Sequence, residues 1–309
     1  MRVAQDRWVL VTGAAGFIGS ATVLTLLDRG YRVRALARRV SADALPWGER
    51  LSLALADIRV PEALSAAMDA VQVVVHLAAR KADEPDSYAV NVEGARNMVS
   101  ACKAHGVERI INVSTQATTS ARRGMYGETK ALADQVFAAS GLSVTTLIPS
   151  LVYGADPNGV FAKLVEHIRR LPVIPVIGNG QAIFQPIHVS DVARTILACI
   201  ENDATINRAY EVGGPDAVTF NDLIDRIARY IGVRKRRVHI PWRAGLLAAR
   251  LCARLLTRPP ITVSNVLGLS PSNAKRLDIR PLMDELGVFP MSLDNGLQRA
   301  LGHAREGRA

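Results

Sequence analysis

The chain has 309 residues, 49% hydrophobic and 21% charged, which is typical of a globular protein with one large domain or two ordinary ones. Its net charge is +10, but the arginines are scattered and no aromatic residues interleave with them, which argues against nucleic-acid binding. Three cysteines cannot form a paired framework, and the Cys and His residues show no metal-ligand spacing. Residues 1–7 carry no apolar signal core, and no uncharged apolar run reaches membrane-spanning length. We therefore expect a cytoplasmic protein of a reducing compartment, without a metal.

From residue 8 to about 150, short apolar stretches alternate with helical stretches. Strands are predicted at 8–12, 32–36, 51–55, 72–77, 109–114 and 144–149, and helices near 17–29, 61–69, 89–105 and 125–140. This alternation predicts an α/β fold, a doubly wound parallel sheet with helices on both faces. His76, at the end of an apolar strand, is interpreted as a packed residue.

The pattern changes after Gly154. Residues 171–180 contain two prolines and are interpreted as a loop, whereas 186–201 indicate a strand and then a helix, and 208–213 indicate one more strand. From about 218 to 309 the sequence is mainly helical. We predict a large domain of residues 1–154, completed by about 186–214, and a smaller, mainly helical lobe of about 155–185 and 215–309.

The segment 12–19, TGAAGFIG, carries the strongest signal in the chain. It lies between a predicted strand and a predicted helix, which is the arrangement of a pyrophosphate site. Gly13 allows the tight turn, Gly16 lets the backbone approach the phosphates, and Gly19 lets helix and strand pack closely. The helix N-terminus adds unpaired N–H groups and the positive end of a dipole. We predict a dinucleotide site that includes Gly13, Gly16, Phe17, Ile18 and Gly19.

The end of the second predicted strand indicates which dinucleotide binds. NAD sites place an acidic residue there to hold the ribose 2′-OH, but this chain has Ala37, followed by Arg38 and Arg39. Guanidinium groups suit a 2′-phosphate, which favours NADP, with NAD as the alternative. The competing interpretation is two solvated arginines at a strand end. Other contacts are expected from residues that follow later strands: Asp57 and Ile58 at the adenine, and Leu77, Ala78 and Ala79 beside the phosphates and ribose.

Tyr126 and Lys130 are four residues apart on a predicted helix and therefore share a face. Tyrosine, with a pKa of about 10, is a poor base at neutral pH, but a neighbouring ammonium and an oxidised nicotinamide stabilise its phenolate. We expect Tyr126 to exchange a proton with a substrate hydroxyl or carbonyl, and Lys130 to bind the nicotinamide ribose. The strand 109–114 ends shortly before them, where Thr115, or as second choice Ser114, is expected to polarise the substrate oxygen.

Taken in order, these motifs resemble the short-chain dehydrogenase/reductase superfamily in its extended and atypical branches, the NAD-dependent epimerase/dehydratase group. The resemblance covers nearly the whole chain and includes TGAAGFIG, the pair at 57–58, HLAA at 76–79, NVEG at 91–94, YxxxK at 126–130, PSLVYG at 149–154 and HVSDVA at 188–193. It implies a Rossmann-like domain, a C-terminal substrate lobe, and Thr115, Tyr126 and Lys130 as the catalytic set. It also implies that Asn91, Ser114, Pro149 and Val152 border the cofactor. In similar proteins the helices at 89–105 and 125–140 form a dimer bundle, so we expect a homodimer.

The chain departs from the family pattern at three places. Ile148 and Phe184 stand where sugar-nucleotide enzymes often carry Arg, and Gln116 begins the pair that replaces the acidic pair of 4,6-dehydratases, so dehydration is not expected. The first-choice substrate is a nucleotide sugar, reduced or epimerised through a keto form. Two alternatives stay open: an NADPH-binding structural or assembly subunit, similar to the accessory subunit of respiratory complex I, and a dehydrogenase for a lipid alcohol of the 3β-hydroxysteroid kind.

Residues 242–258 predict a helix with a broad apolar side and arginines largely on the other. The leucines are Leu246, Leu247, Leu251, Leu255 and Leu256, and the arginines are Arg243, Arg250, Arg254 and Arg258. The interpretation we prefer is that the leucines pack on the core while the arginines face water. The alternative is that this cationic helix lies in an anionic membrane surface. The preferred interpretation of His188 and Asp191 is a helix-start hydrogen bond in the fold, and the alternative is a catalytic role.

Overall fold

A computed structural model describes residues 7–39, 48–80, 86–120, 123–156, 159–255, 262–269 and 276–302. Its centre is a seven-stranded sheet in the order β11-β6-β5-β4-β1-β2-β3, with every neighbouring pair parallel. The strands are β1 Trp8–Thr12, β2 Arg32–Ala37, β3 Leu51–Leu55, β4 Val71–His76, β5 Arg109–Val113, β6 Ser143–Pro149 and β11 Ala209–Val212. The predicted Rossmann-like doubly wound parallel sheet is confirmed.

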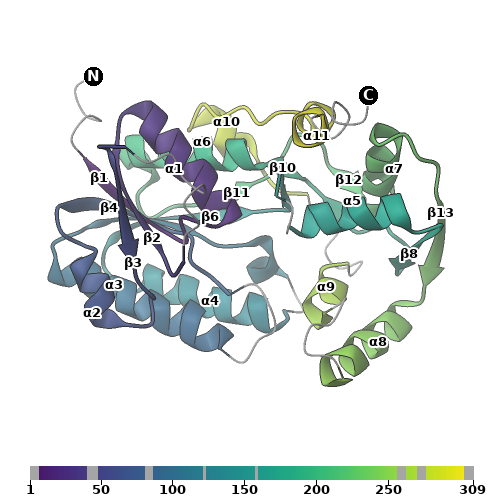
Figure 1. The fold of residues 1–309 in the computed structure, drawn as a ribbon, viewed down its shortest axis with the longest axis horizontal. Coiled ribbons are helices and arrows are strands. Elements are labelled where there is room, and N and C mark those ends of the chain that lie inside the picture. The colour runs from purple at the N-terminus through teal and green to yellow at the C-terminus, as the bar shows by residue number, and fades with distance from the viewer. Residues whose placement is uncertain are drawn as a thin grey trace.

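Helices cover both faces of this sheet (Figure 1). One face carries α2 Pro61–Ala66, α3 Gly94–Ala104 and α4 Met125–Ala138, and the other carries α1 Phe17–Arg29 and α6 Val189–Glu201. Because both faces are covered, the central strands β1, β4 and β5 are buried almost throughout. The stretch predicted as one helix over 89–105 begins with a π-helical segment, Ala89–Glu93, and continues as α3.

After β6 the chain leaves the large sheet and returns to it. The excursion contains α5 Val160–Arg170 and four short strands, and α6 and β11 then rejoin the sheet, where α6 packs against α1 and β11 pairs with β6. Residues near the C-terminus return as well, because Leu282 of α10 Arg280–Asp284 and Val288 lie in the core on the α1 face. Buried apolar contacts therefore join the C-terminal part of the chain to the sheet.

The smaller lobe packs α5 against α7 Phe220–Tyr230 and α11 Leu293–Leu301. Short strands pair beside these helices: β7 Val152–Tyr153 with β10 Ile187–His188, β9 Ile183–Phe184 with β12 Val218–Thr219, and β8 Val173–Ile177 with β13 Arg236–Ile240. The prediction of a loop over 171–180 is wrong for β8. Pro175 is tolerated there because a two-stranded ribbon consists of edge strands.

The basic helix is α8 Trp242–Leu255, which packs on α9 Val263–Gly268. Its buried side carries Gly245 and Ala249, whereas Leu247, Leu251 and Leu255 are exposed to solvent. The preferred interpretation is therefore wrong for these three leucines, whereas Leu246 does pack on the lobe and the described arginines of α8 face water. Leu256 and Arg258 lie outside the described residues. Within the described ranges, no helix combines the length and the apolar character needed to cross a membrane.

Candidate active site

The glycine run forms a tight turn between β1 and α1. Gly13 has a φ of +66°, and a Cβ there would lie 3.1 Å from the backbone of Ala78. A Cβ on Gly19 would collide with the Gly13 carbonyl, so the predicted close packing of helix and strand requires glycine. Gly16 is the N-cap of α1 and offers no side-chain cap, which leaves the first N–H groups of the helix available to an anion.

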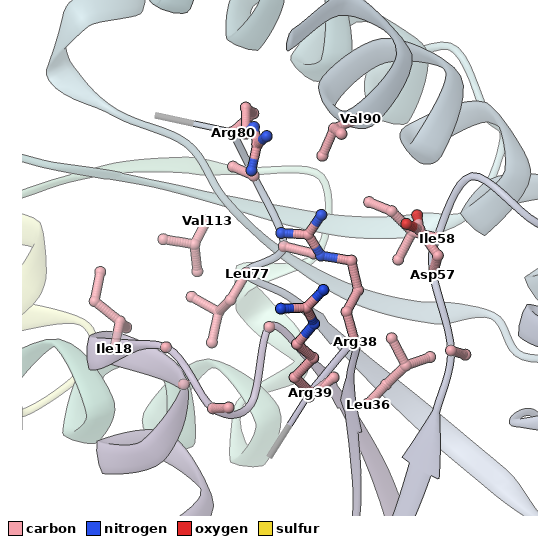
Figure 2. A pocket seen from close by; sticks show the side chains of 18 of the residues that line it. Ile18, Leu36, Arg38, Arg39, Asp57, Ile58, Leu77, Arg80, Val90 and Val113 are labelled. Atoms are coloured by element: carbon pink, nitrogen blue, oxygen red, sulfur yellow. The ribbon is translucent and has the colours of Figure 1, made fainter. Parts of the chain in front are cut away.

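A cavity of about 950 Å³ opens at the carboxyl ends of β1, β2, β3, β4 and β5 (Figure 2). Fourteen of the predicted cofactor residues line it: Gly13, Gly16, Phe17, Ile18, Gly19, Arg38, Arg39, Asp57, Ile58, Leu77, Ala78, Ala79, Ser114 and Tyr126. A ligand in this cavity would meet both the glycine turn and Tyr126. The residues present therefore fit a dinucleotide, with its phosphates at the turn and its reactive ring near Tyr126.

One end of the cavity is rich in guanidinium groups. Arg38 and Arg39 extend from the end of β2 into the cavity (Figure 2), and neither forms an ion pair with any described residue. Asp57, the one carboxylate among the described lining residues, accepts the backbone N–H of Arg59 at 3.0 Å and also accepts from Nε and Nη2 of its guanidinium group, with Arg59 Nη2 and Asp57 Oδ2 2.7 Å apart. This ion pair lowers the pKa of Asp57 and occupies a carboxylate that could otherwise meet a ribose hydroxyl.

Arg59 and Arg80, which no sequence motif indicated, also line this end. Arg59 directly follows the predicted segment 57–58, and Arg80 directly follows the predicted segment 77–79. Both segments lie beyond the end of a parallel strand. Arg80 Nε lies 3.2 Å from Asp86 Oδ1, and Arg59 Nη1 lies 3.8 Å from the other oxygen of the same carboxylate. Among the described residues of this end, Arg38, Arg39, Arg59 and Arg80 outnumber Asp57 and Asp86, and such an excess of positive charge suits a phosphate.

Thr12 ties the ends of β1 and β4 together beneath the glycine turn. Its Oγ1 accepts the N–H groups of Leu77 and Ala78, each at 3.0 Å, and its hydroxyl proton is directed to His76 Nδ1 at 3.3 Å. Burial lowers the pKa of His76 to about 3, and the nearby ammonium of Lys130 acts in the same direction. His76 is therefore a neutral, packed residue, as predicted.

Tyr126 lies in the first turn of α4, and Thr115 precedes the short 3-10 segment Gln116–Thr119 that follows β5. Burial raises the pKa of Tyr126 to about 12, although a hydrogen bond with the Thr115 side chain acts to lower it. The expectation that Lys130 makes this phenol more acidic is wrong for the chain alone. The Lys130 ammonium is buried and donates to the Val113 carbonyl at 3.0 Å instead.

Asp134 is a residue that the sequence analysis missed. It follows Tyr126 and Lys130 at the same helical spacing, so the three side chains lie along one side of α4. Its carboxylate accepts from Asn112 Nδ2 at 2.8 Å and from the Ser114 hydroxyl. Burial lowers the pKa of Lys130, and Asp134 opposes that shift. Asp134 therefore fixes the end of β5 and helps to keep Lys130 charged.

Five predicted site residues do not line the cavity. They are Asn91, Thr115, Lys130, Pro149 and Val152. Asn91 is buried, accepts the N–H of Arg80 at 2.7 Å and donates to the Thr129 hydroxyl at 2.9 Å. Its side chain therefore fixes the backbone of the lining residue Arg80 without itself facing the cavity. Pro149 ends β6, and Val152 begins β7 just beyond it.

His188 and Asp191 have structural roles, as predicted. His188 is the N-cap of α6 and accepts the N–H of Ser190 through its side chain. The fully buried Asp191 binds Arg194 and accepts the N–H of Met291 at 2.9 Å, which ties the C-terminal segment to α6.

The fold and the cavity define the class of the protein: a Rossmann-like domain in which Tyr, Lys and Thr side chains stand near the strand ends, as in the extended short-chain dehydrogenases/reductases. Residues 9–213 match the family of NAD dependent epimerases/dehydratases, and the chain belongs to this family of enzymes. The resemblance drawn from the sequence motifs is thus confirmed.

Relatives in this family differ in their substrates. The chain is 26% identical to 2-alkyl-3-oxoalkanoate reductase of Stenotrophomonas maltophilia, over 94% of this chain and 97% of that enzyme. It is 31% identical to 3 beta-hydroxysteroid dehydrogenase/Delta 5-->4-isomerase of Mycobacterium tuberculosis, over 56% of this chain and 55% of that enzyme. Among solved structures, MoeE5 in complex with UDP-glucuronic acid and NAD is 25% identical, with a TM-score of 0.75 and coverage of 97% and 99% of the two chains.

Proposed function

We propose that this protein is an NADP(H)-dependent reductase that converts a ketone on an apolar substrate to a hydroxyl group. The observation that carries the cofactor choice is the pair Arg38 and Arg39, which reach into the cavity where NAD enzymes place a carboxylate. Guanidinium groups suit a 2′-phosphate, and these two have no carboxylate partner in the part of the chain that the structure describes. The backbone of the glycine turn and the N-terminus of α1 would hold the two bridging phosphates.

Tyr126 is the proton donor in this proposal. When bound, the reduced nicotinamide supplies a hydride to the carbonyl carbon. The phenol of Tyr126 gives its proton to the carbonyl oxygen, and the Thr115 hydroxyl donates a hydrogen bond to the same oxygen. A pKa of about 12 keeps Tyr126 protonated at neutral pH, which suits ketone reduction better than alcohol oxidation. Lys130, one helical turn away, would bind the nicotinamide ribose, and its ammonium also donates to the Val113 carbonyl at 3.0 Å.

Two side chains favour an apolar substrate over a nucleotide sugar. Phe184 and Ile148 replace the arginines that sugar-nucleotide enzymes often carry, and the Phe184 ring packs 5.8 Å from that of Phe220. An aromatic pair offers no charge to a substrate diphosphate, whereas it can contact an acyl chain or a steroid ring. The names of the two enzyme relatives describe such substrates. A nucleotide sugar is the second candidate, supported by the likeness to MoeE5.

The test is NADPH consumption by the purified chain with three ketones: a 2-alkyl-3-oxoalkanoate, a 3-oxosteroid and a UDP-4-ketosugar. We expect turnover with one of the first two and none with the sugar. Turnover with the sugar alone would establish the second candidate instead. If NADPH binds but none of the three is reduced, the interpretation as a structural, cofactor-binding subunit is favoured.

A further inference from the structure

The positive charge of the protein is concentrated in one stretch of the chain, so the interpretation of the arginines as scattered is wrong for the net charge. Residues 226–277 contain 12 of the 38 Lys and Arg residues and none of the 28 Asp and Glu residues, so the rest of the chain has 26 basic and 28 acidic residues. The described part of this stretch contains the end of α7, then β13, α8 and α9, at the end of the smaller lobe (Figure 1). The net charge of the chain is therefore a property of this one region and not of the whole surface.

Helix α8 shows leucine and arginine together on its exposed side. Leu247, Leu251 and Leu255 follow one another at four-residue spacing and are 59%, 48% and 80% exposed. Arg250 and Arg254 each precede one of these leucines by one residue, so an arginine row runs beside the leucine row. Leucines gathered on one exposed helix face form the kind of apolar patch that marks an interaction site.

The inward side of α8 explains why the leucines face out. Gly245 lies so close to Ile177 that a Cβ there would come within 2.6 Å of the Ile177 side chain, and Ala249 is fully buried. The helix is attached to the lobe by these small residues, together with Trp242 and Leu246. The attachment leaves no room inside for the larger leucines, which therefore stay on the outer surface.

We propose that the exposed face of α8 binds a membrane surface that contains anionic lipids, with the leucine row in the acyl boundary and the arginines at the headgroups. Interfacial helices combine such an apolar row with flanking cations. The charge of the patch argues against a second copy of this chain, since a symmetric contact would bring the arginine rows of two copies together. A nucleic acid would use the arginines but would leave the leucines in water.

The position of α8 relates this surface to the active site. Helix α9 contacts α8 on one side and α4 on the other, and Ser264 of α9 lies against Gly124, the N-cap of α4. Tyr126 lies in the first turn of α4, two residues after Gly124. A bilayer held by α8 therefore lies two packed helices from the proposed proton donor, which suits an apolar ketone that enters from the bilayer. Membrane binding itself does not depend on the proposed reaction.

The test is flotation of the full chain with vesicles of phosphatidylcholine alone or mixed with phosphatidylglycerol, without substrate. One variant replaces Arg243, Arg250 and Arg254 with Gln, and a second replaces Leu247, Leu251 and Leu255 with Gln. A matched control replaces Arg29, Arg96 and Arg280 with Gln, which removes the same charge from exposed ion pairs on other helices. NADPH binding by each variant verifies that it is folded.

We expect the wild type and the control to float with the mixed vesicles and not with phosphatidylcholine alone. The arginine variant should lose on the order of a hundredfold in partition coefficient, and the leucine variant at least about tenfold. The proposal is overturned if the wild type does not float, or if the control loses as much as the arginine variant. It is also overturned if the leucine variant floats normally but sediments as a smaller species than the wild type, because the leucines would then join copies of this chain. A nucleic-acid partner is indicated instead if a DNA duplex binds the wild type and the leucine variant equally while vesicles bind neither.

Discussion

The Asp134 carboxylate accepts a hydrogen bond from the Ser114 hydroxyl group and thereby joins the middle of α4 to the end of β5. The same carboxylate accepts from Asn112 and lies one turn beyond Lys130. It acts through its neighbours and does not line the cavity, so we describe it as a positioning residue.

Replacing Asp134 with Asn should narrow the pH range of ketone reduction. Asp134 raises the pKa values of both Lys130 and Tyr126, so both pKa values should fall in the variant. Both residues then lose their protons at lower pH, and the alkaline limb of the kcat/KM profile should move to lower pH. Asp134→Glu, which keeps the charge, should retain the wild-type limb. If kcat/KM of Asp134→Asn falls by the same factor at every pH, the role of Asp134 is only structural.

Replacing Thr115 with Val should make Tyr126 a poorer base. The Thr115 hydrogen bond lowers the pKa of Tyr126, so its loss raises that pKa further above 10. In the oxidation direction, where Tyr126 must accept a proton, the rising limb of kcat against pH should move to higher pH. The loss of one donor to the substrate oxygen should also lower kcat about a hundredfold. Thr115→Ser keeps the hydroxyl and should restore both properties, and an unshifted limb in Thr115→Val would refute the role.

Replacing Arg38 or Arg39 with Ser should weaken NADPH binding without weakening NADH binding. A charge-assisted hydrogen bond contributes about 1.5–3 kcal/mol, which corresponds to roughly a ten- to hundredfold rise in Kd for each arginine. The measurement is fluorescence titration with each cofactor. Arg29→Ser, which removes an exposed arginine at the end of α1, should change neither Kd. An equal loss for both cofactors would place these arginines at the shared phosphates instead.

The buried His76 should make the protein sensitive to acid. Its pKa is 6.5 in the unfolded chain and about 3 in the fold, so the unfolded state binds the extra proton between these values. The free energy of unfolding should therefore fall with decreasing pH in this window, with a contribution from His76 of up to about 1.4 kcal/mol per pH unit. Urea unfolding of His76→Gln should give a shallower pH dependence than that of the wild type. The control is His105→Gln, which makes the same replacement at an exposed histidine.

The parts of this fold that local sequence determines were predictable. The glycine turn, the strands buried on both faces and the YxxxK helix each depend on residues close together in the chain. The pairing of β8 with β13 joins residues about 60 positions apart in the chain, and no local sequence pattern predicts this pairing. Asp134 could have been predicted from the same i, i+4 spacing that identified Lys130.

The two faces of α8 show a different limit of sequence reasoning. The spacing of leucines and arginines establishes that the helix has distinct sides, but it does not say which side packs on the protein. Here Gly245 and Ala249 face inward because only small residues fit against Ile177 and α9. The shape of the neighbouring surface decided the orientation, and that shape comes from distant parts of the chain.

The most direct test of the proposed function is a single-turnover measurement of NADPH oxidation by the apolar ketone that the substrate panel selects. We predict that Tyr126→Phe binds NADPH with the wild-type Kd and oxidises it at least about a thousandfold more slowly, because the proton donor is absent. Tyr230→Phe, which removes a hydroxyl group in the smaller lobe, should react at the wild-type rate. A Tyr126→Phe variant that oxidises NADPH as fast as the wild type would contradict the account.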